Sequence, residues 1–351
     1  TLDGGEFVRN YDKLVIATGA RPIQPPLPGS DLEGVFALRS LDSGLGVQRF
    51  LVEQEPRRAI VVGGGYIGVE MAETFRRQGL DVTMLIRSGQ VLRATLDDDL
   101  RELVQAELTR NGVDVLQSTP HAFEGEGRVR TVVTADGRLP CDIVLLGMGA
   151  RPNVELAKST GVALGATGAI AADSHMRTNL PNVYTAGDCA EALHLVTGKP
   201  AYIPLGSTAN KQGRVAGTNA GGGEATFGGV VGTMVVRAFE LAVASTGLTE
   251  ANARAAGYSV QGTTIRAKDI SHFFPGAADS HIQLVHERDS GRLLGGQIVG
   301  NPGVAKRVDV LVAALHNQMT ITELQRLDLS YAPPFSPVWD PILVAANVAA
   351  R

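Results

Sequence analysis

Apolar and polar positions alternate most regularly between residues 59 and 86. Residues 59–62 are an apolar run that predicts a buried strand, and a glycine-rich segment, 63–68, follows it directly. Apolar side chains then recur every four residues, as on one face of a helix, at Ile67, Met71 and Phe75. Gly79 stands where that helix should end, and residues 82–86 read as the next strand.

Three glycines give this segment its chemistry. Gly63, Gly65 and Gly68 form the pattern G-x-G-x-x-G between the predicted strand and the predicted helix. In a βαβ unit this arrangement lays a pyrophosphate on the N-terminus of the helix. The alternative is a merely structural turn, but the strand and helix on either side favour a dinucleotide site.

Two segments of the chain share a sequence pattern. Residues 12–22 and 142–152 share an Asp, an apolar strand and a Gly-Ala-Arg-Pro ending, which predicts two related domains. Gly149 lies 86 residues after Gly63, whereas Gly19 has only 18 residues before it. If the two domains are built alike, a first glycine fingerprint should lie about 70 residues or more before Thr1. We therefore expect that an N-terminal piece is absent.

Beyond residue 150 the pattern changes twice. Residues 182–188 read as a short strand ending in Gly-Asp, and residues 207–219 read as a helix. Five strands are then expected, at 232–236, 241–245, 259–266, 281–287 and 293–299. Two helical runs follow, at 304–317 and from Thr322, which is placed to cap. A separate C-terminal α+β domain is predicted.

The predicted fold is therefore α/β, with Rossmann-like dinucleotide-binding domains and a C-terminal α+β domain. We assign residues 1–38 and 149–228 to the first of these domains, residues 39–148 to the second, and residues 229–351 to the C-terminal domain.

Composition narrows the class of protein. Glycine is in excess, at 42 of 351 residues, which suits tight turns and close backbone approaches to a ligand. The net charge is −4 without a polybasic run, so nucleic acid is not expected as a partner. Apolar runs are too short for a transmembrane helix, so a membrane is not expected either. The two cysteines and seven histidines show no metal-ligand spacing, and a reducing cytoplasm is the expected compartment.

The end of the second strand bears on the choice of nicotinamide cofactor. A carboxylate there would bind the adenosine 2′-hydroxyl of NADH, but this chain has Ile86 followed by Arg87. Arginine binds a 2′-phosphate through charge-assisted hydrogen bonds, and Arg93 could close on the same group. The pattern favours NADP, although Arg93 alone could be an ordinary surface residue.

A second candidate site surrounds the Gly-Asp pair. Gly187 allows close backbone approach, and the Asp188 carboxylate can accept a hydrogen bond from a ribityl hydroxyl. A helix starting at Ser207 could direct its positive end at a flavin. An ordinary strand-end turn is the alternative.

Together these segments resemble the flavoprotein disulfide reductases with two dinucleotide-binding domains, that is, the FAD- and NAD(P)-dependent pyridine nucleotide-disulfide oxidoreductases. The resemblance runs over essentially the whole chain and rests on residues 63–75, 17–19, 185–188 and 206–214. Residues 244–250 and 331–336 resemble the branch that holds coenzyme A disulfide reductase, NADH oxidase and NADH peroxidase. Tyr-Ala-Pro-Pro at 331–334 with Asp340-Pro341 is most similar to coenzyme A disulfide reductase.

The resemblance implies roles for matching residues. Tyr66 would shield the flavin until nicotinamide displaces it, and Glu70 would hold the nicotinamide side. Asp188 would bind the FAD ribityl chain, and Ala209 would approach the isoalloxazine. Tyr331 would be catalytic, reaching into the partner subunit's active site of a homodimer. The alternatives are a core aromatic for Tyr66, a surface carboxylate for Glu70 and a packed turn for Tyr331.

The ends of the two repeated strands, at 12–22 and 142–152, are also predicted to contact cofactor. The residues concerned are Thr18, Gly19 and Gly149.

Departures from the family pattern bear on the reaction. The redox cysteine of the family lies in the expected N-terminal piece, and Cys141 and Cys189 are interpreted as packing residues. Phe273 and Phe274 stand where some relatives carry a tyrosine pair.

Three functions follow as hypotheses. The first is an enzyme that uses FAD and NADPH to reduce a small-molecule disulfide, coenzyme A disulfide or a related persulfide. The second is an oxidase or peroxidase that reduces oxygen or peroxide. In the third, this chain alone is a non-catalytic module that binds nucleotide and dimerises.

Overall fold

The structure is a computed structural model that describes residues 8–351, apart from the side chain of residue 304. The chain forms two compact units, each built from two separate stretches of sequence. Unit 1 contains the described residues up to Arg21 together with Ala150–Val230. Unit 2 contains Pro22–Gly149 and Val231–Arg351.

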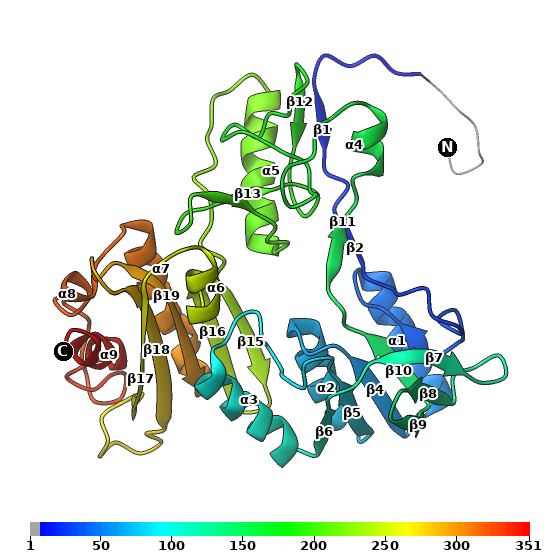
Figure 1. Ribbon diagram of the computed structural model, residues 1–351, viewed down its shortest axis with the longest axis horizontal. Coiled ribbons are helices and arrows are strands. Elements are labelled where there is room, and N and C mark those ends of the chain that lie inside the picture. The colour runs from blue at the N-terminus through cyan, green and yellow to red at the C-terminus, as the bar shows by residue number, and fades with distance from the viewer. Residues whose placement is uncertain (1–7) are drawn as a thin grey trace. The chain divides into compact units, whose positions relative to one another are not determined.

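A five-stranded parallel sheet is the centre of the first half of unit 2 (Figure 1). Its strands, in spatial order, are β3 (Val35–Phe36), β10 (Ile143–Leu146), β4 (Arg58–Val62), β5 (Asp81–Leu85) and β6 (Val113–Leu116). Three helices belong to this half: α1 (Leu41–Gln54), α2 (Tyr66–Arg77) and α3 (Asp98–Arg110). Strand β10 is apolar throughout and β4 is apolar after Arg58, as expected of parallel strands covered on both faces. The predicted Rossmann-like α/β architecture is confirmed.

Helix α2 differs in one respect from the periodicity read in the sequence. Phe75 and Ala72 are fully buried as expected, but Ile67 is 41% exposed. The buried face includes Gly68 and Val69 instead, because Gly68 in the first turn packs closely against the backbone of Gly63. Gly79 follows the helix with a φ of 85°, a left-handed conformation suited to glycine.

Several elements of this half were not predicted. Helix α1 contains two glycines and buries only Val47 and Phe50, so its periodicity is weak; it begins instead at a capping box formed by Ser40 and Ser43. A three-stranded antiparallel sheet was also missed, and it consists of β7 (Pro120–Glu124), β8 (Thr131–Thr134) and β9 (Gly137–Pro140).

The second half of unit 2 is a five-stranded antiparallel sheet with helices (Figure 1). The strands, in spatial order, are β15 (Met234–Ala238), β16 (Leu241–Gly247), β19 (Leu293–Gly300), β18 (Asp279–Glu287) and β17 (Val260–Lys268). The helices are α6 (Glu250–Ala255), the 3₁₀ segment η1 (Pro302–Arg307), α7 (Val308–His316), α8 (Ile321–Leu324) and α9 (Pro341–Ala349). All five predicted strands are present, with shifted ends.

The predicted cap at Thr322 is wrong. Helix α8 begins after Thr320, whose hydroxyl accepts a hydrogen bond from the N–H of Glu323, and the Glu323 side chain returns the contact. Thr320 and Glu323 thus form a capping box, and Thr322 lies inside the helix. The predicted run at 304–317 is also divided, because Pro302 opens a 3₁₀ segment before α7.

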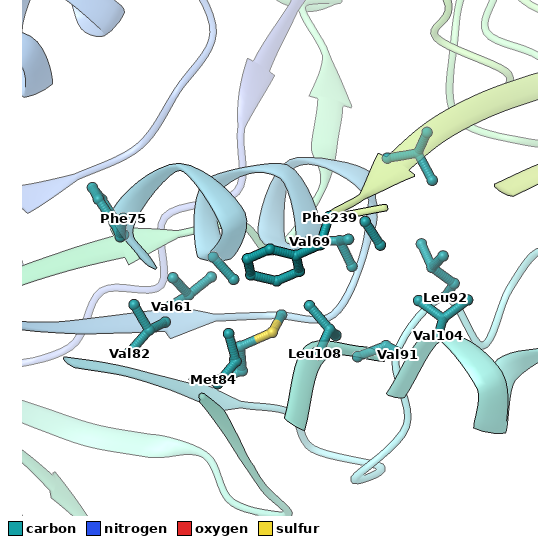
Figure 2. Close-up of a cluster of buried hydrophobic side chains, with 14 of the residues drawn as sticks. Val61, Val69, Phe75, Val82, Met84, Val91, Leu92, Val104, Leu108 and Phe239 are labelled. Atoms are coloured by element: carbon teal, nitrogen blue, oxygen red, sulfur yellow. The ribbon is translucent and has the colours of Figure 1, made fainter. Parts of the chain in front are cut away.

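One hydrophobic core joins the two halves of unit 2. Figure 2 shows the ring of Phe239, from the turn after β15, lying among side chains of the parallel sheet and its helices, including Val69 and Met84. Val91 and Leu92, from the loop after β5, belong to the same cluster. The halves of unit 2 therefore share one apolar interior.

Unit 1 is assembled around a short parallel pair. Strand β1 (Leu14–Ile16) pairs with β12 (Val183–Thr185), although more than 160 residues separate them along the chain. The other elements are β2 (Ala20–Pro22) with β11 (Ala150–Pro152), β13 (Ala192–His194) with β14 (Lys199–Ala201), α4 (Glu155–Ser159) and α5 (Gly206–Ala220). Between residues 8 and 351, no helix combines the length and apolarity needed to cross a membrane.

Candidate functional site: two glycine-rich cofactor cradles

The glycine turn in unit 2 is closely packed from beneath. A Cβ on Gly63 would lie 2.4 Å from the carbonyl oxygen of Gly147, and Gly63 has a φ of 109°. A Cβ on Gly68 would lie 2.1 Å from the carbonyl oxygen of Gly63. Gly147 in turn lies close to the N–H of Gly68. These glycines let β4, α2 and the end of β10 approach one another more closely than residues with side chains would allow.

Gly65 has the opposite surroundings. A Cβ added there would meet no atom within 4 Å, so the position faces open space. Gly65 is the N-cap of α2 and makes no side-chain cap hydrogen bond, which leaves N–H groups of the first turn available to a ligand. Open space above a helix N-terminus is what an approaching pyrophosphate requires, so these residues fit the predicted dinucleotide.

The loop after β5 lies against the glycine turn. Ile86 is buried and its Cδ1 would be 2.7 Å from a Cβ on Gly64. Leu92 donates its N–H to the carbonyl oxygen of Gly64 at 2.7 Å and adopts a left-handed φ of 49°. Arg87 and Arg93 are both exposed on this loop. The structure thus places two arginines on a loop that is hydrogen-bonded to the dinucleotide cradle.

Tyr66 and Glu70 lie on the first turns of α2. Burial raises the pKa of the Tyr66 phenol, against the opposite effect of a hydrogen bond with Thr95 from the loop after β5. Glu70 lies on the exposed side of the helix, yet partial desolvation of its carboxyl group raises its pKa, and the neighbouring Glu73 raises it further. Both side chains therefore stand at the helix end that carries the glycine fingerprint.

Unit 1 holds the Thr18 and Gly19 strand end in a defined turn. Asn153 holds it, because the Asn153 side-chain Nδ2 donates to the backbone carbonyl oxygen of Thr18 at 2.9 Å. The backbone carbonyl oxygen of Asn153 also accepts from the Thr18 hydroxyl at 2.6 Å. The N–H of Asn153 also donates to the carbonyl oxygen of Gly19, which has a φ of 66°. Asn153 was not among the predicted residues, although it directly follows the repeated Gly-Ala-Arg-Pro.

Gly187 and Ala209 are neighbours in unit 1. A Cβ on Gly187 would lie 3.6 Å from the Cβ of Ala209, near the start of α5. The N–H of Gly187 donates to Gln212 Oε1 at 2.9 Å, and Gln212 is fully buried. Asp188 comes next in the chain, half-buried. The Gly-Asp turn and the N-terminus of α5 therefore form one cradle.

Helix α5 begins at Gly206, one residue before the predicted Ser207, and its N-cap makes no side-chain hydrogen bond. Its first turn is thus open to a ligand, as at α2. Gln212 was missed by sequence reasoning, but it lies three residues after Ala209 and therefore on the same helix face. These residues fit a flavin, because they combine a close backbone approach, a carboxylate and a helix N-terminus.

Four predicted residues remain, namely Gly149, Tyr331, Cys141 and Cys189. Gly149, two residues after Gly147, has a φ of 94°, and its carbonyl oxygen accepts a hydrogen bond from the N–H of Ile23. Tyr331 belongs to the C-terminal half of unit 2 and is half-exposed. Cys141 and Cys189 are fully buried, and burial raises the pKa of the Cys141 thiol to about 12. Neither thiol is therefore suited to act as a nucleophile.

In the described part of the chain, no group of three or more His, Cys, Asp or Glu side chains is arranged to hold a metal ion. The two cradles consist of glycines, helix ends and a few polar groups, which is the composition of nucleotide sites.

Comparison with known proteins identifies the family. The pyridine nucleotide-disulphide oxidoreductase model matches residues 1–213, and the dimerisation domain of the same family matches residues 234–341. The chain is 40% identical over 346 residues to the NAD(P)H coenzyme A polysulfide/persulfide reductase of Pyrococcus horikoshii, covering 99% of this chain and 78% of that protein.

Two solved structures share the fold. A NAD-dependent persulfide reductase from A. fulgidus superposes with a TM-score of 0.94 at 40% identity, over 97% of this chain and 63% of that one. An engineered water-forming NADPH oxidase, derived from the Lactobacillus brevis enzyme, superposes with a TM-score of 0.92 at 29% identity, over 97% of this chain and 76% of that one. The chain spans less than two thirds of the first of these structures. The chain belongs to the pyridine nucleotide-disulphide oxidoreductase family.

Proposed function

We propose that the protein is an FAD-dependent oxidoreductase that takes electrons from NADPH and reduces a small-molecule disulfide, coenzyme A disulfide or a related persulfide. The observation that carries this proposal is the pair of glycine-rich cradles, one in each unit, each at a helix N-terminus that lacks a side-chain cap. FAD is assigned to unit 1 and the nicotinamide cofactor to unit 2. The domain limits given in the sequence analysis stay a prediction.

The preference for NADPH is supported by spacing in a relative. In the engineered NADPH oxidase an aspartate is replaced by alanine, and the next two residues are replaced by arginine and serine. A second arginine is introduced six residues after the first. This chain has Arg87, Ser88 and Arg93 at that spacing, with the apolar Ile86 directly before them. Two guanidinium groups on one loop can bind a 2′-phosphate through charge-assisted hydrogen bonds.

The residues of this chain would act mainly by binding and orientation. The chemistry that FAD supplies in such enzymes is acceptance of a hydride and delivery of its electrons to a second substrate. Tyr66 would cover the nicotinamide position and exclude water from it, and its hydrogen bond with Thr95 would hold the ring. Glu70 retains its proton to a higher pH than an ordinary glutamate. Its carboxyl group would hydrogen-bond to the nicotinamide side of the cofactor.

The acceptor is assigned from relatives and from the thiols of this chain. Reduction of one disulfide consumes NADPH and a proton and releases two thiols. A thiolate nucleophile is required, and the burial of Cys141 and Cys189 removes both as candidates. The nucleophile of the whole protein would then come from outside these 351 residues. The similarity to a coenzyme A polysulfide/persulfide reductase favours a disulfide or persulfide substrate.

We also infer a homodimer, because the C-terminal half matches a dimerisation domain. Exposed apolar side chains support it, and they include Phe335, Val338 and Trp339 in the segment that follows Tyr331. A second copy covering this segment would bring Tyr331 to the active site of its partner. The two buried, unpaired cysteines fit a reducing compartment, which favours the cytoplasm.

A competing function is reduction of oxygen, as in the water-forming oxidase named above. Turnover of the full-length protein with NADPH separates the two functions. Release of thiol from coenzyme A disulfide without oxygen consumption supports the proposal, and oxygen consumption without thiol release contradicts it. The flavin spectrum of this purified chain tests the module hypothesis, because tightly bound FAD would show that the chain alone retains its flavin cradle.

A further inference from the structure

The loop that carries Arg87 and Arg93 is fastened at its far end to the C-terminal half of unit 2. The fastening point is Asp97, whose N–H donates to Gln297 Oε1 at 2.7 Å. The side-chain amide of Gln297 also donates, from Nε2 to Asp97 Oδ2 at 2.6 Å. Asp97 and Gln297 thus form a two-point clasp between residues 200 positions apart in the sequence. Gln297 is 1% exposed, so water competes little for these bonds.

The carboxylate of Asp97 contacts the C-terminal half of unit 2 and does not cap its own helix. Asp97 is the N-cap of α3, where an aspartate usually accepts a hydrogen bond from the first turn of its own helix. Here it makes no such bond. Its oxygens accept instead from Gln297 and, at 3.1 Å each, from the N–H of Glu250. The orientation of Asp97 therefore serves the contact with the C-terminal half.

The segment between Arg93 and Asp97 is held along its length. Asn252 donates from its side chain to the carbonyl oxygen of Ala94 at 3.3 Å. Leu96 is buried in the shared core, and Thr95 makes the hydrogen bond with Tyr66. An open cavity of about 520 Å³ lies beside the segment, lined by Arg93 and Asp97 among others. The arginine can move into that space if the clasp is lost.

We infer that the Asp97–Gln297 clasp is a positioning element for nicotinamide-cofactor specificity: it holds Arg93 where it meets the 2′-phosphate of NADPH. The inference rests on the proposed function, in which Arg87 and Arg93 bind that phosphate. Recognition by a guanidinium group depends on placement within about 0.5 Å, so a loosened loop weakens it. NADH has no 2′-phosphate and makes no use of Arg93. Loss of the clasp therefore lowers NADPH affinity selectively.

The test measures the ratio of NADPH affinity to NADH affinity by isothermal titration calorimetry on this chain. Gln297→Met keeps the length and burial of the side chain but removes both hydrogen bonds, and it should lower the ratio about fivefold. The double variant Asp97→Asn with Gln297→Glu reverses the direction of the side-chain bond and preserves the net charge. It should restore the ratio to within about twofold of the wild type.

The matched control is Glu107→Met, at the other end of α3. Glu107 accepts a hydrogen bond from the N–H of Glu240 and so also joins the two halves of unit 2, at the end of α3 away from Asp97. Its substitution should leave the ratio unchanged. An equal loss of NADPH and NADH affinity in Gln297→Met, or an unchanged ratio, overturns the inference.

Arg93→Ala distinguishes failure of the inference from failure of the proposed function. If Arg93→Ala lowers the ratio and Gln297→Met does not, NADPH recognition by the loop stands and the clasp has no part in it. If the wild-type chain binds both cofactors equally, the proposed NADPH preference and the inference fall together.

Discussion

Two glycines of one fingerprint should respond to alanine in opposite ways. Gly63 has a φ of 109°, and an added Cβ would lie 2.4 Å from the carbonyl oxygen of Gly147. Gly65 has an extended backbone, with φ −80° and ψ −171°, and faces open space. Gly63→Ala should therefore damage the fold, whereas Gly65→Ala should spare the fold and damage the cofactor site.

The magnitudes follow from these surroundings. A non-glycine residue in a strained left-handed conformation costs about 1–3 kcal/mol, and overpacking against backbone adds about 1–3 kcal/mol. Gly63→Ala should lower the free energy of unfolding by about 2–6 kcal/mol. Gly65→Ala changes only an N-cap preference, so its effect on the free energy of unfolding should stay within about 1 kcal/mol. Its methyl group, however, would occupy the space that the proposed site leaves for a pyrophosphate.

Urea denaturation and calorimetric titration with NADPH measure the two effects separately. We expect Gly63→Ala to shift the unfolding midpoint strongly. Gly65→Ala should keep the wild-type midpoint and weaken NADPH binding by about tenfold or more, equivalent to about 1.4 kcal/mol or more. The reasoning is refuted if Gly65→Ala destabilises the chain as much as Gly63→Ala. It is equally refuted if Gly65→Ala binds NADPH normally.

Three further substitutions or modifications test the structure. Burial alone would raise the pKa of Asp142, but hydrogen bonds from the Arg58 side chain and nearby backbone N–H groups lower it. Asp142→Asn should therefore cost about 2 kcal/mol of unfolding free energy near neutral pH. This difference from the wild type should shrink as the pH falls below the ordinary value of 3.8, and a difference independent of pH would contradict the assignment. Phe239→Ala should destabilise unit 2 by about 3–5 kcal/mol in urea, because its ring fills the core between the two halves; a loss under about 1 kcal/mol would speak against that core. Cys141 and Cys189 should react with a thiol reagent only after denaturation, and rapid labelling of the native chain would contradict their burial.

The fingerprint could be read from the sequence because two of its glycines, Gly63 and Gly68, meet a local steric requirement. Gly63 needs a positive φ, Gly68 needs room for a backbone contact, and both needs leave a visible pattern between a strand and a helix. The repeated strand end at Gly19 and Gly149 likewise predicted two related domains, but the pairing of β1 with β12, two strands far apart in the sequence, was not predicted. Short-range geometry was thus accessible.

Long-range polar contacts were not accessible. Asp97 reads in the sequence as an ordinary acidic residue before a helix, and Gln297 as a residue within a strand. Their hydrogen bonds exist only because the two halves of unit 2 share a core, which no local periodicity encodes. Gln212 and Asn153 were missed for a related reason, because each supports a cofactor cradle through its side-chain amide rather than through a motif residue.

The shared core of unit 2 gives the nicotinamide cradle a property that its glycine turn alone would lack. The N–H of Leu92 donates a hydrogen bond to the carbonyl oxygen of Gly64 in the glycine turn. The side chains of Leu92 and Leu96 are buried in a hydrophobic cluster with residues of the C-terminal half, Val236 and Val299. Substitutions in the C-terminal sheet can therefore change cofactor affinity without touching the cofactor, provided that they move this loop. Because packed cores shift between discrete arrangements rather than deform smoothly, such effects should be largest for buried residues beneath the loop after β5.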